Sequence, residues 1–199
     1  TLSSTISLAA YGAFPNSVAV KNGIVAVAME ANPKTDNGKV VFFTTAGVFQ
    51  SEVTVGAQPD MLTFTPNGSK VLVANEGEPN VGDTINPAGS ISVISLTGGV
   101  GSPTVTTASF TAFDGLEDKL RGQGVRISAG KSFSVDAEPE YIAVSADGTT
   151  ARITLQENNA FAVLNLSTDT ITSIQALGLK DFNTGTPQLT NYDFDQSTL

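Results

Sequence analysis

The sequence has 199 residues, of which 40% are hydrophobic and only 15% are charged, and its formal net charge is −9. The absence of Cys and His excludes disulfides, thiolate nucleophiles, His-dependent catalytic triads and the usual zinc sites within this chain. Acidic residues outnumber basic ones and no basic stripe is present, which argues against nucleic acid as a partner.

The first residues do not have the pattern of a signal peptide. Residues 1–10 lack the basic residues that open a signal peptide, and no apolar run approaches the ~18 residues that span a bilayer. We therefore expect no membrane insertion in this segment, and any export signal to lie outside it.

Thr5–Ala10 leads into Pro15 as residues 53–55 lead into Pro59, which predicts the outer strand of an earlier repeat unit.

The first full repeat is opened by Pro15 and reverses direction at Asn22-Gly23. Asn-Gly accepts positive φ at little cost and therefore predicts a tight turn between two antiparallel strands. Its four predicted strands cover residues 14–20, 24–30, 39–43 and 47–55.

The second repeat has the same form. Pro59 opens it, and Asn67-Gly68 predicts its first reversal. Its four predicted strands cover residues 58–64, 70–76, 90–96 and 104–110.

The repeat is then interrupted by an insertion, residues 111–137, which is the most charged stretch of the chain and is expected to form one or two helical turns over 115–121. The third repeat is opened by Pro139 and reverses at Asp147-Gly148. Its predicted strands cover residues 138–144, 151–156, 160–166 and 170–177, and the tail from 180 either begins a further unit or lies across the surface.

Each repeat thus reads as a four-stranded antiparallel meander with the length of one propeller blade. The sequence predicts an all-β fold, a single partial β-propeller domain over 1–199, with blades at roughly 15–56, 57–110 and 138–178. Closed rings usually need four to eight blades. The expected partners are therefore the remaining propeller blades or copies of this chain.

The connections between second and third strands, and between one blade and the next, should lie on one face, where the long loops and several carboxylates gather. Inner strands line the axis of a propeller, so the residues after the opening prolines should lie near the central opening. Three roles remain open for these acids: pinning the next strand, holding calcium, or binding and catalysis. The predicted ligand-binding face contains Asp60, Glu76, Glu78, Glu138, Glu140 and Glu157.

Two further groups of charged residues are weaker candidates. Glu30, Asp36 and Asp83 could supply oxygen ligands to calcium, although none follows an EF-hand spacing. The insertion offers three basic residues for an anion such as phosphate, or for pairing with its own acids in a solvated loop. These basic residues are Lys119, Arg121 and Arg126.

Five long stretches of the sequence match a known pattern of blade residues: 39–43, 59–68, 73–80, 138–145 and 154–160. They resemble the choice-of-anchor I proteins, exported bacterial propellers similar to mesenchyme-specific cell-surface glycoproteins, and the blades resemble YVTN-type repeats. The resemblance implies a secreted, periplasmic or cell-surface bacterial protein with a seven-bladed ring. Some relatives are described as alkaline-phosphatase-like or phytase-like.

Together these features favour a non-catalytic binding, adhesion or interaction module, stabilised by calcium, with a surface protein or polysaccharide as partner. The alternative is a calcium-dependent phosphoester hydrolase that uses the carboxylates and the basic residues of the insertion.

Overall fold

The fold of residues 5–178, which a computed structural model describes, consists of three four-stranded antiparallel sheets and a few short helices. The first sheet contains β1 (Phe14–Lys21), β2 (Ile24–Glu30), β3 (Asn37–Thr44) and β4 (Phe49–Ala57). The second contains β5 (Pro59–Phe64), β6 (Lys70–Asn75), β7 (Ser90–Ser95) and β8 (Thr104–Ser109). The third contains β9 (Pro139–Val144), β10 (Thr150–Leu155), β11 (Ala160–Asn165) and β12 (Thr170–Ala176). Each strand predicted within the three repeats is present.

Equivalent turns are closed by equivalent side chains. Asn67 Oδ1 accepts hydrogen bonds from Thr65 Oγ1 at 2.9 Å and from the Ser69 amide at 3.0 Å. Asp147 plays the same part in the third sheet, where it accepts from Ser145 Oγ at 2.6 Å and from the Thr149 amide. A local side-chain acceptor fixes such a turn and with it the register of the hairpin.

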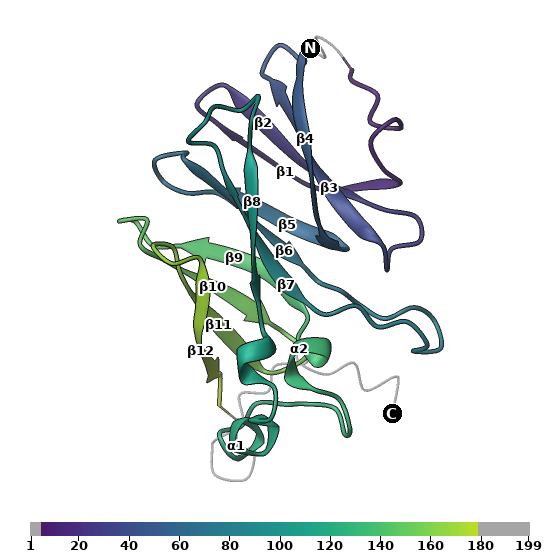
Figure 1. The fold of residues 1–199 in the computed structure, drawn as a ribbon, viewed down its shortest axis with the longest axis vertical. Helices are drawn as coiled ribbons and strands as arrows, with labels where there is room; N and C mark the ends of the chain where they lie inside the picture. The colour runs from purple at the N-terminus through teal and green to yellow at the C-terminus, as the bar shows by residue number, and fades with distance from the viewer. Residues whose placement is uncertain (1–4, 179–199) are drawn as a thin grey trace, which may run out of the picture.

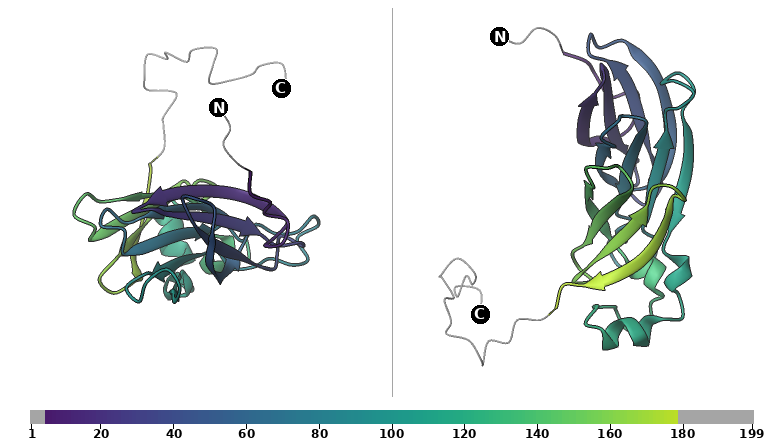
Figure 2. Two further views of the ribbon diagram at one scale, coloured as in Figure 1. Left: turned by 90° about the horizontal axis from the view of Figure 1, so that it is seen from above. Right: turned by 90° about the vertical axis from the view of Figure 1, so that its left-hand side faces the viewer.

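The three sheets lie next to one another in chain order, with β1 against β5 and β5 against β9 (Figures 1 and 2). The first and second sheets enclose an apolar layer, because alternate side chains of each strand point to the same face. This layer contains Ala26, Ala28, Val40 and Phe42 from the first sheet and Leu62, Val71, Val73 and Ile94 from the second.

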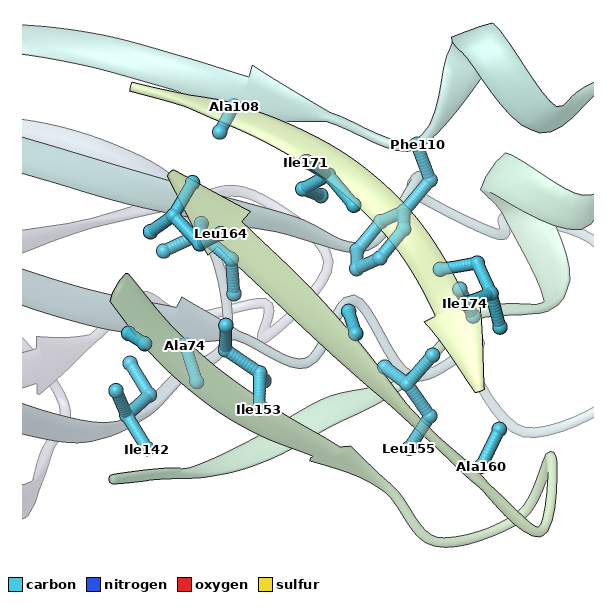
Figure 3. Close-up of a cluster of buried hydrophobic side chains, with 14 of the residues drawn as sticks. Ala74, Ala108, Phe110, Ile142, Ile153, Leu155, Ala160, Leu164, Ile171 and Ile174 are labelled. Atoms are coloured by element: carbon cyan, nitrogen blue, oxygen red, sulfur yellow. The ribbon is translucent and has the colours of Figure 1, made fainter. Parts of the chain in front are cut away.

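A second layer fills the space between the second and third sheets and extends into the insertion. Ala74 and Ala108 of the second sheet face Ile153, Leu164 and other residues of the third (Figure 3). Phe110, which follows β8, packs edge-to-face on Phe133 of the insertion, with ring centroids 5.8 Å apart. The insertion is therefore part of the core and not a free loop.

A glycine of one sheet meets the opening proline of the next sheet at both junctions. A Cβ on Gly38 would lie 2.5 Å from Pro59 Cδ, and one on Gly89 would lie 2.7 Å from Pro139 Cδ and 2.0 Å from the Ala137 carbonyl oxygen. No real Cβ tolerates such distances. The pair of a glycine at the start of the third strand, or just before it, and a proline that opens the next sheet thus sets how closely the blades approach.

The insertion contains a 3₁₀ turn over Thr111–Phe113 and two short helices, α1 (Glu117–Gly122) and α2 (Phe133–Asp136). The helical turns expected over 115–121 correspond to α1, while α2 was not predicted. Two acids of the insertion fix the start of α2: Glu117 accepts the Phe133 amide at 3.0 Å, and Asp114 accepts the Ser134 amide at 2.8 Å. Among the described residues no helix is long and apolar enough to cross a membrane.

The expectation that Thr5–Ala10 forms a strand is wrong. Residues 5–8 are irregular and a turn follows. The described residues contain no strand beside this segment for it to pair with, so its backbone has no ladder to join. Instead, Leu8 and Tyr11 pack on the face of the first sheet that points away from the second, where Tyr11 stacks on Phe49 with ring centroids 5.6 Å apart. The predicted fate of residues 180–199 lies outside the described residues.

Candidate functional site

Carboxylates from all three sheets stand at corresponding ends of the strands. Asp60 and Glu140 are the second residues of β5 and β9, and Glu30 is the last residue of β2. Because β1, β5 and β9 are neighbours, these strand ends lie on one side of the structure. We call the resulting group the axial cluster: Glu30, Asp60, Glu76, Glu78, Glu138, Glu140 and Glu157.

The long loops of the three blades meet beside the axial cluster. Lys34, in the loop after β2, forms an ion pair with Glu78, in the loop after β6. Lys131, in the insertion, forms a second ion pair with Asp83 of that loop, with Nζ and Oδ1 3.2 Å apart. The Gly89 amide donates to the Ser134 carbonyl at 3.1 Å. These contacts agree with the prediction that the long loops share one face.

Gln58 connects two members of the axial cluster. Its side chain is buried, and its amide nitrogen donates to Glu76 and, at 3.2 Å, to Glu78. Its backbone has φ of 49°, a left-handed conformation that non-glycine residues rarely adopt. The backbone of Gln58 is held in a rarely adopted conformation, and its buried side-chain amide fixes the orientation of two carboxylates. Such strain is often found at functional sites.

The environment of the axial cluster disfavours ionisation at two glutamates. Burial, reinforced by the nearby charges of Asp60 and Glu78, raises the pKa of Glu76 to about 7. Burial, reinforced by Glu157 and Glu78, likewise raises the pKa of Glu138 to about 7, although Lys131 opposes the shift. Both groups therefore change charge near neutral pH.

The other members respond according to their neighbours. Burial and then the charge of Glu30 raise the pKa of Asp60, and burial and then Glu157 raise the pKa of Glu140. The hydrogen bond from Lys34 instead lowers the pKa of Glu78, which stays ionised. Carboxylates of neighbouring blades thus influence one another, Glu30 acting on Asp60 and Asp60 acting on Glu140.

A cavity of about 340 Å³ lies at the edge of the axial cluster, between the insertion and the third blade. Two of the cluster's glutamates, Glu138 and Glu157, line it. Its other charged residues, Arg126, Lys131 and Asp136, come from the insertion, so the cavity carries charges of both signs.

The structure does not gather the three basic residues considered for an anion. Arg121 donates to Asp118 at 3.0 Å and to two backbone carbonyls, and it lines a separate hollow of about 350 Å³ beside α1. Arg126 lines the mixed-charge cavity and donates to the Gln156 carbonyl at 3.1 Å. Lys119 is an exposed residue of α1. The solvated-loop alternative accounts for the pairing of Arg121 with Asp118.

The residues considered for calcium are likewise separate. Asp83 accepts from Asn86 at 3.1 Å and from Lys131, Glu30 accepts from Asn16 at 3.2 Å, and Asp36 lies in the loop between β2 and β3. Within residues 5–178 no three acidic side chains converge closely enough to hold a metal ion. Calcium binding gains no support from this geometry and stays a prediction.

Several residues of the site were not predicted from the sequence. Lys34, Lys131 and Gln58 belong to no motif that singles them out in the sequence. Asp136, which lines the cavity, lay within an insertion whose fold had no repeat to compare with. The one available signal was the repeat itself, because Gln58 stands where Glu138 stands, immediately before the blade-opening proline.

The comparisons with known proteins agree with this architecture. The family model described as "Choice-of-anchor I domain" matches residues 1–198. The β-propeller domain of Myceliophteria thermophila Cps50 (Swd1) is similar in fold, with a TM-score of 0.53 and 9% identity over 84% of this chain and 44% of that one. A eukaryotic initiation factor has a TM-score of 0.52 and 13% identity, over 87% of this chain and 34% of its own. The chain therefore spans less than half the length of either structure. No curated protein matches the chain in sequence.

Proposed function

Since the chain belongs to the choice-of-anchor I family, we propose that it is part of an exported or cell-surface propeller, and that it acts as an interaction module whose axial cluster binds a cationic partner. Propeller blades are rigid scaffolds on which ligands bind at loop-bearing ends. Surface proteins and polysaccharides are the candidate partners.

The observation that supports this proposal is the convergence of carboxylates from three blades at one end of the strands. Burial, and then repulsion by neighbouring carboxylates, raises the pKa of Glu76 and of Glu138 to about 7. A positive charge that approaches these carboxyls favours their ionised form and offsets the repulsion among the neighbouring carboxylates.

The test is binding of a lysine-rich peptide as a model cationic partner, measured by calorimetry at two salt concentrations. The double variant Glu76→Gln with Glu140→Gln should weaken binding about tenfold or more, since each removed carboxylate loses one charge-assisted contact. Glu52→Gln is the matched control. Glu52 lies on β4, the outer strand of the first blade, where it pairs with Lys39 of β3 and is not a member of the cluster. Equal affinity for all three proteins would contradict the proposal.

Two carboxyls with pKa values about 7 also suit proton transfer, which keeps the phosphoester hydrolase as the second candidate. Release of phosphate from p-nitrophenyl phosphate, with calcium and with a chelator, separates the two. Calcium-dependent turnover that disappears in Glu76→Gln and in Glu138→Gln would favour the hydrolase.

A further inference from the structure

The cavity between the insertion and the third blade differs from the axial cluster in its charges. The axial cluster consists of acids alone, whereas the cavity is lined by the basic Arg126 and Lys131 as well as by acidic residues such as Glu138 and Glu157. Its volume of about 340 Å³ lies within the range of small-molecule sites, roughly 300–1,000 Å³. A pocket of this size and charge calls for a ligand that carries both signs.

The wall of the cavity is fixed by one buried residue. Asn158, which is 1% exposed, donates from Nδ2 to the Arg126 carbonyl at 2.9 Å and to the Asp136 carboxylate at 3.1 Å. The Arg126 amide returns a hydrogen bond to the Asn158 carbonyl at 2.8 Å, and Asp136 also accepts the Ser128 amide at 3.0 Å. The backbone of Arg126 and the carboxylate of Asp136 are thus held in place before any ligand arrives, which reduces the entropy that binding must overcome.

Several charged groups that line the cavity have donors or acceptors without a hydrogen-bond partner among the described residues. Within residues 5–178 neither Glu138 nor Glu157 accepts a hydrogen bond, although Glu138 is half-buried. The Arg126 guanidinium uses one nitrogen on the Gln156 carbonyl, and the remaining donors have no partner among the described residues. Lys131 makes a single surface ion pair with Asp83, which is weak and exchangeable. Glu138 is half-buried, whereas Arg126 and Glu157 are exposed at the rim of the cavity, where their charged atoms are accessible to a ligand.

We propose that this cavity binds a small zwitterion, a molecule with an ammonium and a carboxylate group such as a free α-amino acid. Glu138 and Glu157 receive the ammonium group, and Arg126 with Lys131 receives the carboxylate. A simple amine would give Arg126 and Lys131 no negative group to bind, and their positive charges would repel it. A simple anion would meet the repulsion of Asp136, Glu138 and Glu157, which outnumber the two cations.

The test compares three forms of one ligand by NMR titration of the whole chain: L-threonine, N-acetyl-L-threonine and L-threonine methyl ester. L-threonine should bind at least about tenfold more tightly than either derivative, because each derivative loses one charged contact. Equal binding of the methyl ester would show that the cavity recognises amines only, and equal binding of the acetylated form would show that it recognises anions only. Either result, or no shift of cavity resonances up to about 10 mM, would overturn the proposal.

Variants separate this cavity from the axial cluster. Glu138→Gln and Arg126→Gln should each weaken L-threonine binding about tenfold, and Gln at 126 retains the backbone bonds to Asn158. Glu140→Gln is the control, since Glu140 belongs to the axial cluster but does not line the cavity. Loss of threonine binding in Glu140→Gln would overturn the assignment to the cavity. Peptide binding at the axial cluster can fail while threonine binding persists, so the two proposals are tested independently.

Discussion

The layers between the blades and the axial end of the same blades are built from the same strands, yet they have opposite effects on stability. Along β6, Val71 and Val73 are fully buried between the sheets, whereas Glu76, just beyond the strand, has a pKa raised to about 7. Burial stabilises the first two and disfavours the charge of the third. The comparison teaches that the apolar layers hold the fold together, whereas burial of the axial carboxylates reduces its stability.

The largest effect should come from the layer between the second and third blades. Phe110→Ala should lower the free energy of unfolding by about 3–5 kcal/mol, because it removes a fully buried ring and its contact with Phe133. Urea denaturation measures it. Phe14→Ala is the matched control, since Phe14 is 63% exposed, and should change stability by less than about 1 kcal/mol. Similar losses in both variants would break the comparison.

The junction between those two blades should be the next most sensitive position. Gly89→Ala should cost about 1–3 kcal/mol, since the new Cβ meets the Ala137 carbonyl and the Pro139 ring and forces the blades apart. Thermal unfolding measures the loss. Gly101→Ala, at a position with open space around it, is the control and should leave the melting temperature almost unchanged. A tolerant Gly89 would mean that the junction is loosely packed.

The carboxyls of the axial cluster should make the free energy of unfolding depend on pH. The pKa values of Glu76 and Glu138 are raised from 4.5 to about 7, so the folded state binds more protons than the unfolded state between these values. Stability should therefore fall as pH rises from about 4.5 to 7, by about 1–2 kcal/mol after discounting for solvent screening. Glu78, Glu117 and Asp147 have lowered pKa values and act oppositely, below this window. Denaturation at pH 5 and pH 8 tests the sign, and greater stability at pH 8 would contradict it.

The smallest effect isolates one carboxylate. Glu76→Gln should raise stability at pH 8 by about 1 kcal/mol, because the amide keeps the bond from Gln58 but carries no charge to bury. At pH 5 the gain should shrink, since Glu76 is then protonated. Glu52→Gln, on the outer strand of the first blade, should show no such pH-dependent gain. A destabilised Glu76→Gln at both pH values would show that the charge itself supports the fold.

The fold could be predicted from the sequence because the signals for its turns and strands are local. Asn22-Gly23, Asn67-Gly68 and Asp147-Gly148 mark the first hairpin of every blade, and alternation of apolar residues sets the strands on either side. Thr5–Ala10 shows the limit of that reasoning, since a strand pattern produces a strand only where a neighbour offers its hydrogen bonds. The local signals in Thr5–Ala10 could not reveal that Leu8, together with Tyr11 just after this segment, would pack on the first sheet instead.

The site could be predicted only in part. The repeat placed Asp60 and Glu140 at equivalent strand ends, which is a local property of each blade. Three contacts of the site join residues far apart in the chain. They are the ion pairs of Lys34 and Lys131 and the hydrogen bond from Asn158 to the Arg126 carbonyl. Such contacts depend on the paths of irregular loops, which follow no period.

The most direct test of the account is to measure the ionisation of individual carboxyls by side-chain NMR titration. We predict that Glu76 and Glu138 titrate near pH 7, while Asp147, whose carboxylate accepts bonds from Ser145 and Thr149, titrates below the ordinary aspartate range. If Glu76 and Glu138 instead titrated near 4.5, the carboxylates of the three blades would not share one axial environment, and the proposed binding end would be contradicted.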